Sequence, residues 1–183
     1  RDRDQVLVRF SNRSCSVLVA TDVAARGLDI AQLEAVINVD ITPDAEVHIH
    51  RIGRTGRADE EGWAFSLVSM DEMGRVGRIE QLQGPSEFHP LSDLEADASK
   101  QFEPLRPPMA TLQILGGRKE KIRAGDVLGA LTKDMGFSGA QIGKININDF
   151  STYVAVAADI APEALRSLNA GKVKGRSVKV RLL

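Results

Sequence analysis

Short apolar runs alternate with amphipathic segments over the first half of the chain. Three apolar runs predict β-strands, at residues 16–20, 35–39 and 63–68. Helical periodicity predicts helices at residues 5–13, from Asp44 toward Arg54, and at 71–82. Strands that alternate with helices are typical of βαβ units, so we expect a parallel sheet covered on both faces. The chain opens within this pattern, without the earlier strands such a sheet needs, which predicts a truncated domain.

The second half has a different order of elements. The pattern predicts a strand, a helix, two strands, a helix and a strand, at residues 111–115, 125–135, 142–147, 152–157, 162–168 and 177–182. This βαββαβ order is typical of an α+β sandwich with two helices on one face of an antiparallel sheet. Alternation along the strands assigns a set of mostly polar side chains to the open face: Gln113, Lys144, Asn146, Tyr153, Lys179 and Arg181.

A proline-rich segment separates the two halves. Five of the seven prolines fall between residues 84 and 108. Proline favours extended backbone for itself and for the residue before it, so a packed helix or central strand is not expected there. The predicted domains are therefore residues 1–83 and 109–183, joined by a linker at 84–108.

Charge is divided unevenly between these parts. The whole chain of 183 residues has a net charge of −1, but residues 109–183 hold 12 Lys and Arg against 6 Asp and Glu. A basic domain behind an acidic one indicates a nucleic-acid partner on the basic side. The single cysteine excludes an internal disulfide, and no apolar run is long enough to cross a bilayer. These features favour a cytoplasmic protein without a membrane partner.

Two motifs in the first half suggest phosphate chemistry. They are ATDVAARGLDI at residues 20–30 and HRIGRTGR at residues 50–57. The second motif spaces Arg51, Arg54 and Arg57 three residues apart, which on a helix would place them near one edge. Three positive charges held together repel one another, so stability alone does not favour them. Each guanidinium group can, however, donate two parallel hydrogen bonds to phosphate oxygens. The arginines therefore indicate a polyanion site.

These motifs resemble motifs V and VI of the DEAD-box RNA helicases, which lie in the second of two RecA-like domains. The opening RDRDQVLVRF resembles the helix after motif IV. The resemblance covers residues 1–83 and implies part of a RecA-like parallel sheet with flanking helices. The fold class expected for the whole chain is thus this partial α/β domain, the linker, and the α+β sandwich.

The resemblance also implies roles for individual residues. Arg54 and Arg57 match the arginines that act at the γ-phosphate of ATP, and Asp29 matches the carboxylate that binds the ribose. Four residues match positions at the cleft between the two RecA-like domains, where they contact the nucleotide or connect the domains. They are His50, Arg51, Asp22 and Arg26. Residues that match positions on the RNA backbone are Arg3, Thr21 and Gly27.

Two nucleotide-binding motifs are missing from this sequence. It has no G-x-x-x-x-G-K-[ST] loop and no DEAD sequence. In the family both belong to the first RecA-like domain, which would be the partner of this one within the full-length enzyme. ATP and Mg²⁺ are expected there, whereas this chain alone should bind neither and should be inactive. A metal site at His48 and His50 is not expected, because two histidines at that spacing lack further ligands.

The second half resembles an RNA recognition motif (RRM) domain, specifically the C-terminal domain of DbpA-type DEAD-box helicases. The segments GGRKEKIRAGDVLGAL, IGKI and GKVKGRSVKVRLL carry this resemblance. The stacking aromatics of an ordinary RRM are mostly absent, leaving Tyr153, with Phe150 just before the strand. Basic residues must therefore contribute more. The candidate RNA-binding residues are Arg118, Lys119, Lys121, Arg123, Lys144, Tyr153, Lys172, Lys174, Arg176, Lys179 and Arg181. Two of their clusters are expected at opposite ends of the sheet.

The resemblance implies a target and a task. DbpA-type domains bind a hairpin of 23S ribosomal RNA, helix 92, while the helicase core opens nearby duplex during large-subunit assembly. The expected partners are therefore 23S rRNA and precursors of the large ribosomal subunit. One alternative is an RNA-tethered assembly adaptor that never hydrolyses ATP. Another is a cold-shock helicase of the CsdA type, which the end of the chain directly after the last strand disfavours.

Overall fold

The computed structural model describes residues 2–25, 33–56, 61–93 and 103–183. The chain divides into two compact units, one formed by residues 1–26 together with 103–183 and the other by residues 27–102. This division differs from the domains expected from the sequence, because the first 26 residues group with the second half of the chain. The predicted domains are defined by sequence motifs and by the proline-rich segment. The compact units are defined by which residues lie close together in space.

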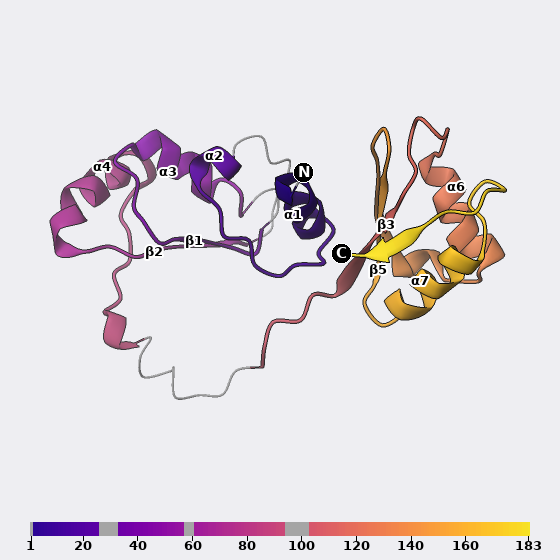
Figure 1. The fold of residues 1–183 in the computed structure, drawn as a ribbon. Coiled ribbons are helices and arrows are strands. Elements are labelled where there is room, and N and C mark those ends of the chain that lie inside the picture. Colours follow the sequence, from indigo (N-terminus) through magenta and orange to yellow (C-terminus); the bar gives the residue numbers. More distant parts are fainter. Residues whose placement is uncertain (1, 26–32, 57–60, 94–102) are drawn as a thin grey trace. The chain divides into compact units, whose positions relative to one another are not determined.

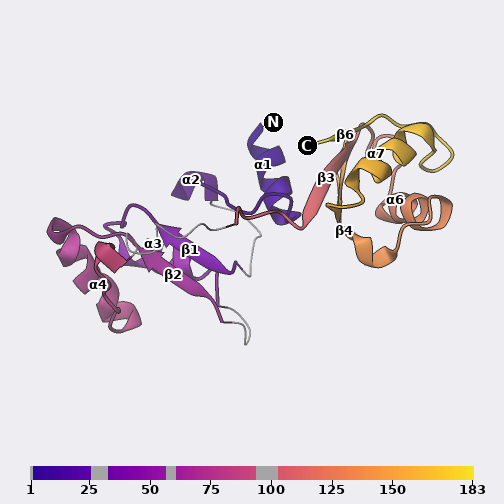
Figure 2. The ribbon, with the colours of Figure 1, turned by 90° about the horizontal axis from the view of Figure 1, so that it is seen from below.

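The larger unit contains a four-stranded antiparallel sheet in the order β4-β5-β3-β6. Its elements are β3 (Met109–Ile114), α6 (Ala124–Gly129), the π-helix η2 (Ala130–Asp134), β4 (Ile142–Ile147), β5 (Thr152–Ala157), α7 (Ala161–Ala170) and β6 (Val180–Leu182). A 3₁₀ turn, η3 (Gly139–Gln141), precedes β4. Figures 1 and 2 show α6 and α7 on the same side of this sheet. The predicted βαββαβ order is confirmed.

The core of this unit lies between the sheet and the two helices. Leu112, Ile114, Val154 and Val156 are fully buried against the helices, as the strand alternation predicts. Leu182 lies opposite Leu112 in the strand register but is half exposed, because it lies at the end of the edge strand β6.

The helix formed by α6 and η2 changes its winding halfway. Its start is fixed by Asp126, whose carboxylate accepts a hydrogen bond of 2.8 Å from the Arg123 N–H. At Ala130 it widens to a π-helix, in which the Met135 N–H donates to the Ala130 carbonyl. Val127, Ala130 and Leu131 are all buried, as their spacing of three and four residues along a helix predicts. Leu128, on the same helix, is 41% exposed.

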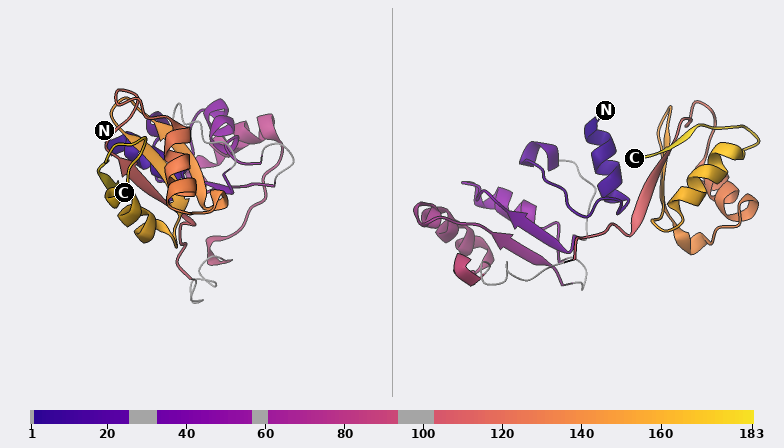
Figure 3. Two further views of the ribbon diagram at one scale, coloured as in Figure 1. Left: turned by 90° about the vertical axis from the view of Figure 1, so that its right-hand side faces the viewer. Right: turned by 60° about the horizontal axis from the view of Figure 1, so that its bottom comes forward.

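The smaller unit is built on two parallel strands, β1 (Ala35–Asn38) and β2 (Trp63–Ser66). Figure 3 shows their arrows side by side and pointing the same way. Helix α3 (Ala45–Ile52), the 3₁₀ turn η1 (Met70–Glu72) and helix α4 (Met73–Gln83) complete the unit, with Ile41, Val76 and Ile79 as its buried core. Asp44 caps α3 as predicted, accepting hydrogen bonds from the backbone N–H groups of Glu46 and Val47.

The remaining elements are α1 (Asp2–Ser11) and α2 (Asp22–Ala25). Residues 16–20, predicted to be a strand, are not one, and Val19 is 94% exposed. A strand forms only where a neighbour satisfies its N–H and C=O groups, and this segment pairs with neither described strand of the parallel sheet. Ile37, Trp63 and Phe65 are also exposed, so in the described residues the sheet is not covered on both faces as expected.

Shortening leucines on the α6–η2 helix should distinguish a buried side chain from an exposed one. Leu131→Ala removes a side chain with no solvent exposure. We expect it to lower the free energy of unfolding of this unit by about 2–5 kcal/mol, through lost burial and the cavity left behind. Leu128→Ala, three residues earlier and 41% exposed, is the matched control and should cost much less. Hydrogen exchange of peptides from residues 109–182 measures both, and equal losses of protection would contradict the described burial.

Candidate nucleic-acid interface and nucleotide-site residues

A row of polar side chains crosses the open face of the four-stranded sheet. The strand register places Asn146, Tyr153, Gln113 and Arg181 opposite one another on β4, β5, β3 and β6. The Gln113 amide donates to the Tyr153 hydroxyl over 3.2 Å, and the Arg181 guanidinium donates to the Gln113 carbonyl oxygen. This face is therefore preorganised by bonds between side chains of neighbouring strands.

The segment that follows α1 binds the same face. Lys144 donates to the Ser11 hydroxyl over 2.9 Å, and the Asn146 amide donates to Asn12 over 3.4 Å. Asn12 and Ser14 both bond the Thr111 hydroxyl on β3. Residues 11–14 were not among the predicted site residues, because nothing in a local pattern links them to strands about a hundred residues away.

The one tyrosine of the chain is enclosed in this arrangement. Tyr153 is only 6% exposed, and its hydroxyl is already paired with Gln113. Base stacking needs an open ring face, so the described arrangement does not present Tyr153 for it. Its part in RNA binding stays a prediction.

Two exposed loops carry seven of the twelve Lys and Arg side chains found in residues 109–183. We call residues 118–123 and 172–176 the basic loops. Each buries one apolar residue in the core, Ile122 in the first and Val173 in the second. The neighbours on either side point outward, so the exposed set is Arg118, Lys119, Lys121, Arg123, Lys172, Lys174 and Arg176. Lys179 and Arg181 follow and are exposed as well.

The basic loops lie together and not at opposite ends of the sheet, which corrects the expectation from the sequence. The Lys174 ammonium donates to the Lys121 carbonyl oxygen over 2.6 Å and lies 3.6 Å from the Asp126 carboxylate. The order of the strands along the chain could not predict the contact between Lys174 and Lys121. That contact depends on the paths that the two loops take in the folded structure. The two basic loops are therefore joined directly through Lys174.

The turn in the second basic loop has a strained backbone. Val173 and Arg176 exchange backbone hydrogen bonds across a two-residue turn, Lys174–Gly175. Both turn residues have positive φ, 52° and 74°, as a hairpin turn of this kind requires. Lysine seldom adopts this conformation, which costs free energy that the anchor at Val173 and the Lys174 contacts must offset.

In the smaller unit the arginines of the second motif separate. Arg51 lies on α3 and donates to the Asn38 side chain over 3.3 Å and to the Asp40 carbonyl over 2.8 Å. Gly53 ends the helix, so Arg54 falls beyond it, where its carbonyl accepts a bond from the Leu33 N–H. The expected placement of Arg51 and Arg54 on one helix edge is therefore wrong, whereas Arg57 lies outside the described residues.

The two histidines of this motif region differ in environment. His48 is 4% exposed, and burial, followed by the nearby Arg51 charge, lowers its pKa from the usual 6.5. It is thus favoured in its neutral form and belongs to the packing of α3. His50 is exposed. Within the described residues no group of three or more His, Cys, Asp or Glu side chains could hold a metal ion.

The other residues named from the helicase motifs divide into two sets. Arg3 on α1, and Thr21 and Asp22 at the start of α2, are exposed. Arg26, Gly27, Asp29 and Arg57 lie outside the described residues. The roles implied for both sets stay predictions. No helix in the part of the chain that the structure describes is long and apolar enough to cross a membrane.

Comparison with known proteins matches both halves of the chain to families. Residues 1–59 match the helicase conserved C-terminal domain, and residues 111–182 match the DbpA RNA binding domain. Among solved structures, the Escherichia coli DEAD-box protein SrmB, crystallised with the regulator of ribonuclease activity A, is 40% identical over 44% of this chain and 47% of that one, with a TM-score of 0.41.

Two curated relatives align with nearly the whole chain. The ATP-dependent RNA helicase DbpA of Escherichia coli is 49% identical over all of this chain and 39% of its own length. The DbpA of Bacillus subtilis is 35% identical over 98% of this chain and 41% of its own length. The chain thus spans about two-fifths of the relatives it matches. With helicase and RNA-binding sequences present in this order, the chain belongs to the DbpA-type DEAD-box helicases.

Proposed function

We propose that this chain anchors an ATP-dependent RNA helicase to RNA and supplies one side of its ATP site. The observation that carries the proposal is the joined surface of the two basic loops, on a domain matched to the DbpA RNA binding domain. The relatives named as ATP-dependent RNA helicases support the activity of the complete protein.

The basic loops suit a phosphate backbone. Their seven exposed cations stand on one surface, and the described ion pairs within it, Arg118 with Asp149 and Lys174 with Asp126, neutralise few of them. Binding RNA phosphates would relieve the repulsion among these cations and release counterions. Phosphate contacts position a protein on RNA without reading sequence, so the loops supply affinity.

The helicase part suits one half of a split ATP site. The sequence lacks the loop that cradles phosphates and the acidic motif that holds Mg²⁺, so both must come from the first RecA-like domain. Arg51 is engaged with Asn38 and Asp40 and holds the end of β1 to α3. Arg54 and, from the sequence, Arg57 would then supply positive charge at the γ-phosphate, where it stabilises the transition state. Asp29 would bind the ribose.

The family resemblance supplies the target. We propose that the RNA bound is the helix 92 hairpin of 23S rRNA within precursors of the large ribosomal subunit. The helicase would then open duplexes near that hairpin, in the cytoplasm. The net positive charge of residues 109–183 supports an RNA target but does not select this hairpin.

The chain by itself should not hydrolyse ATP. We expect no phosphate release above background, with or without RNA, because no residue is present to cradle the phosphates or hold Mg²⁺. A phosphate-release assay measures this, with Arg54→Ala as the matched control that should give the same background. RNA-stimulated turnover that Arg54→Ala abolishes would contradict the split site.

Reversing one charge in a basic loop should weaken RNA binding. Lys172→Glu is expected to raise the Kd for a 23S rRNA fragment about tenfold at moderate salt, and to reduce the salt dependence by roughly one phosphate contact. Lys133→Glu makes the same change at an exposed position on η2, outside the basic loops, and should have little effect. Equal Kd values for the two variants in a salt titration would exclude the basic loops as the anchor.

Target choice is tested with paired RNAs. Fragments that carry the helix 92 hairpin should bind far more tightly than unrelated hairpins of equal length at the same salt concentration. Phosphate contacts are the same for both, so any difference reports on recognition of bases or shape. Indistinguishable affinities would remove the proposed target and leave a general RNA-binding domain.

A further inference from the structure

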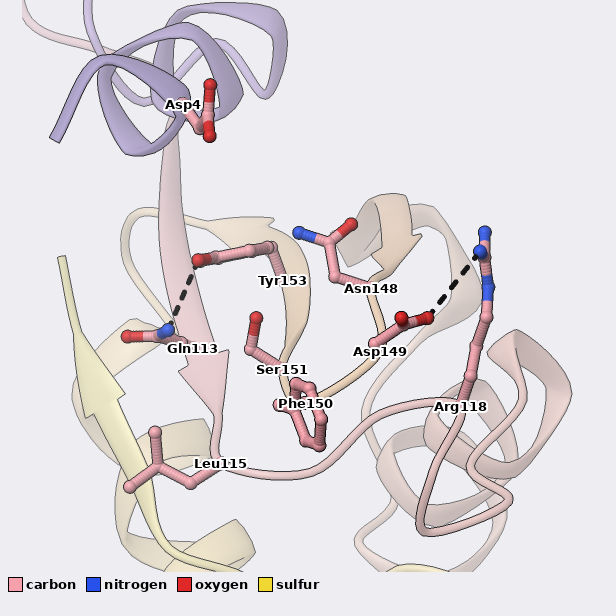
Figure 4. Close-up of a pocket in the computed structure, with 9 residues that line it drawn as sticks. All are labelled: Asp4, Gln113, Leu115, Arg118, Asn148, Asp149, Phe150, Ser151 and Tyr153. Carbon is pink, nitrogen blue, oxygen red and sulfur yellow. Dashed lines mark hydrogen bonds and ion pairs between the residues drawn. The ribbon is translucent and has the colours of Figure 1, made fainter. Parts of the chain in front are cut away.

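An exposed aromatic ring stands at the end of the sheet beside the first basic loop. Phe150, in the turn between β4 and β5, is 70% exposed and faces a hollow of about 590 Å³. Figure 4 shows its ring among Leu115, Asn148, Asp149, Ser151 and Arg118. We call this the Phe150 hollow. Its size is within the range of small-molecule sites, and a ring this exposed contributes little to the core.

The frame of the Phe150 hollow is held by backbone hydrogen bonds. Arg118 N–H donates to the Asn148 carbonyl and Lys119 N–H to the Asp149 carbonyl, both over 2.9 Å. The Asn148 N–H donates to the Ser151 carbonyl over 2.8 Å. Gly117 permits this approach, since a Cβ there would collide with the Asn148 carbonyl oxygen. The two loops therefore hold Phe150 and Arg118 in place before any ligand binds, which lowers the entropic cost of binding.

The side chains around the ring offer a donor beside an acceptor. The Arg118 guanidinium lies 3.9 Å from the Asp149 carboxylate, and both are mostly exposed. A surface pair at this distance contributes little stability, so both groups can serve a ligand at low cost. The Asn148 amide adds a further donor at the same rim.

This arrangement matches the edge of one nucleobase. Guanine presents an acceptor, O6, next to two donors, N1–H and the N2 amino group. A carboxylate accepts from both donors at once, and a guanidinium or amide donates to O6. Adenine places a donor and an acceptor in the reverse order, which would set its N1 lone pair against the carboxylate.

We propose that the Phe150 hollow binds an unpaired guanine of the RNA. The base stacks on Phe150, Asp149 accepts from its N1–H and N2 amino groups, and Arg118 or Asn148 donates to O6. The proposal rests on the proposed RNA-binding function and adds the base that is read beside the phosphate contacts of the basic loops. It places base recognition at the β4–β5 turn, where the ring is open, and not at the enclosed Tyr153.

Titration of the isotope-labelled 183-residue chain with mononucleotides tests the hollow directly. GMP should shift the NMR signals of the Asn148 side-chain amide and the Arg118 backbone amide, with AMP binding about tenfold more weakly. Phe150→Ala should abolish the GMP shifts, whereas Phe150→Tyr keeps a ring and should retain them. Asp149→Asn should bring the GMP and AMP affinities to within about twofold, because one acceptor of the pair becomes a donor.

RNA binding by the same variants separates this proposal from the proposed function. Phe150→Ala should weaken binding of the 23S rRNA fragment about tenfold. Phe88→Ala, which removes another mostly exposed phenylalanine (58%), should not. If the chain binds RNA but GMP shifts nothing at the hollow, or AMP binds as well as GMP, the guanine site is overturned and the basic loops stand. If GMP binds at the hollow but no RNA binds, the guanine pocket stands and the proposed function fails.

Discussion

The proposed RNA-binding surface depends on two apolar side chains that point away from it into the core. Ile122 and Val173 are buried in the core of the larger unit, one from each basic loop. Loops this rich in lysine and arginine would repel one another and sample many conformations if nothing held them. Burying one side chain per loop fixes the backbone, and the basic neighbours on either side are then directed into solvent. The hydrophobic core thus determines where the charges stand.

Hydrogen bonds add to the burial of Ile122 and Val173 in fixing the backbone of the basic loops. Lys174 uses its ammonium group to bind the Lys121 carbonyl and to approach Asp126, so one cation of the surface acts as a tie between the loops. On the other side of the first loop, the N–H groups of Arg118 and Lys119 bind the turn before β5. The proposed phosphate-binding surface and the Phe150 hollow are therefore joined through the backbone of the first basic loop. A base held at the hollow would have its own backbone phosphates within the field of the basic loops.

Much of this unit could be predicted from the sequence, because its pattern is local. Alternation gave the bounds of β4 and β5 and assigned Gln113 and Tyr153 to the open face, where the structure has them. The pairing of the basic loops could not be predicted in this way, since Lys121 and Lys174 meet through the tertiary return of two loops. The same holds for Ser11 and Asn12, which bind Lys144 and Asn146. Periodicity also missed that Gly53 ends α3 before Arg54.

The two units differ in how completely their own described residues cover their sheets and form a core. The larger unit has helices over one sheet face, and twelve of its buried hydrophobic residues form one cluster between them. The smaller unit buries only three hydrophobic side chains in its described core, while Ile37, Trp63 and Phe65 on its two strands face solvent. A parallel sheet is stable when both faces are covered, so this exposed surface is energetically unfavourable. RNA binding can therefore be argued from the contacts of a finished domain. The proposed nucleotide site instead rests on motif residues, of which Asp29 and Arg57 lie outside the described residues.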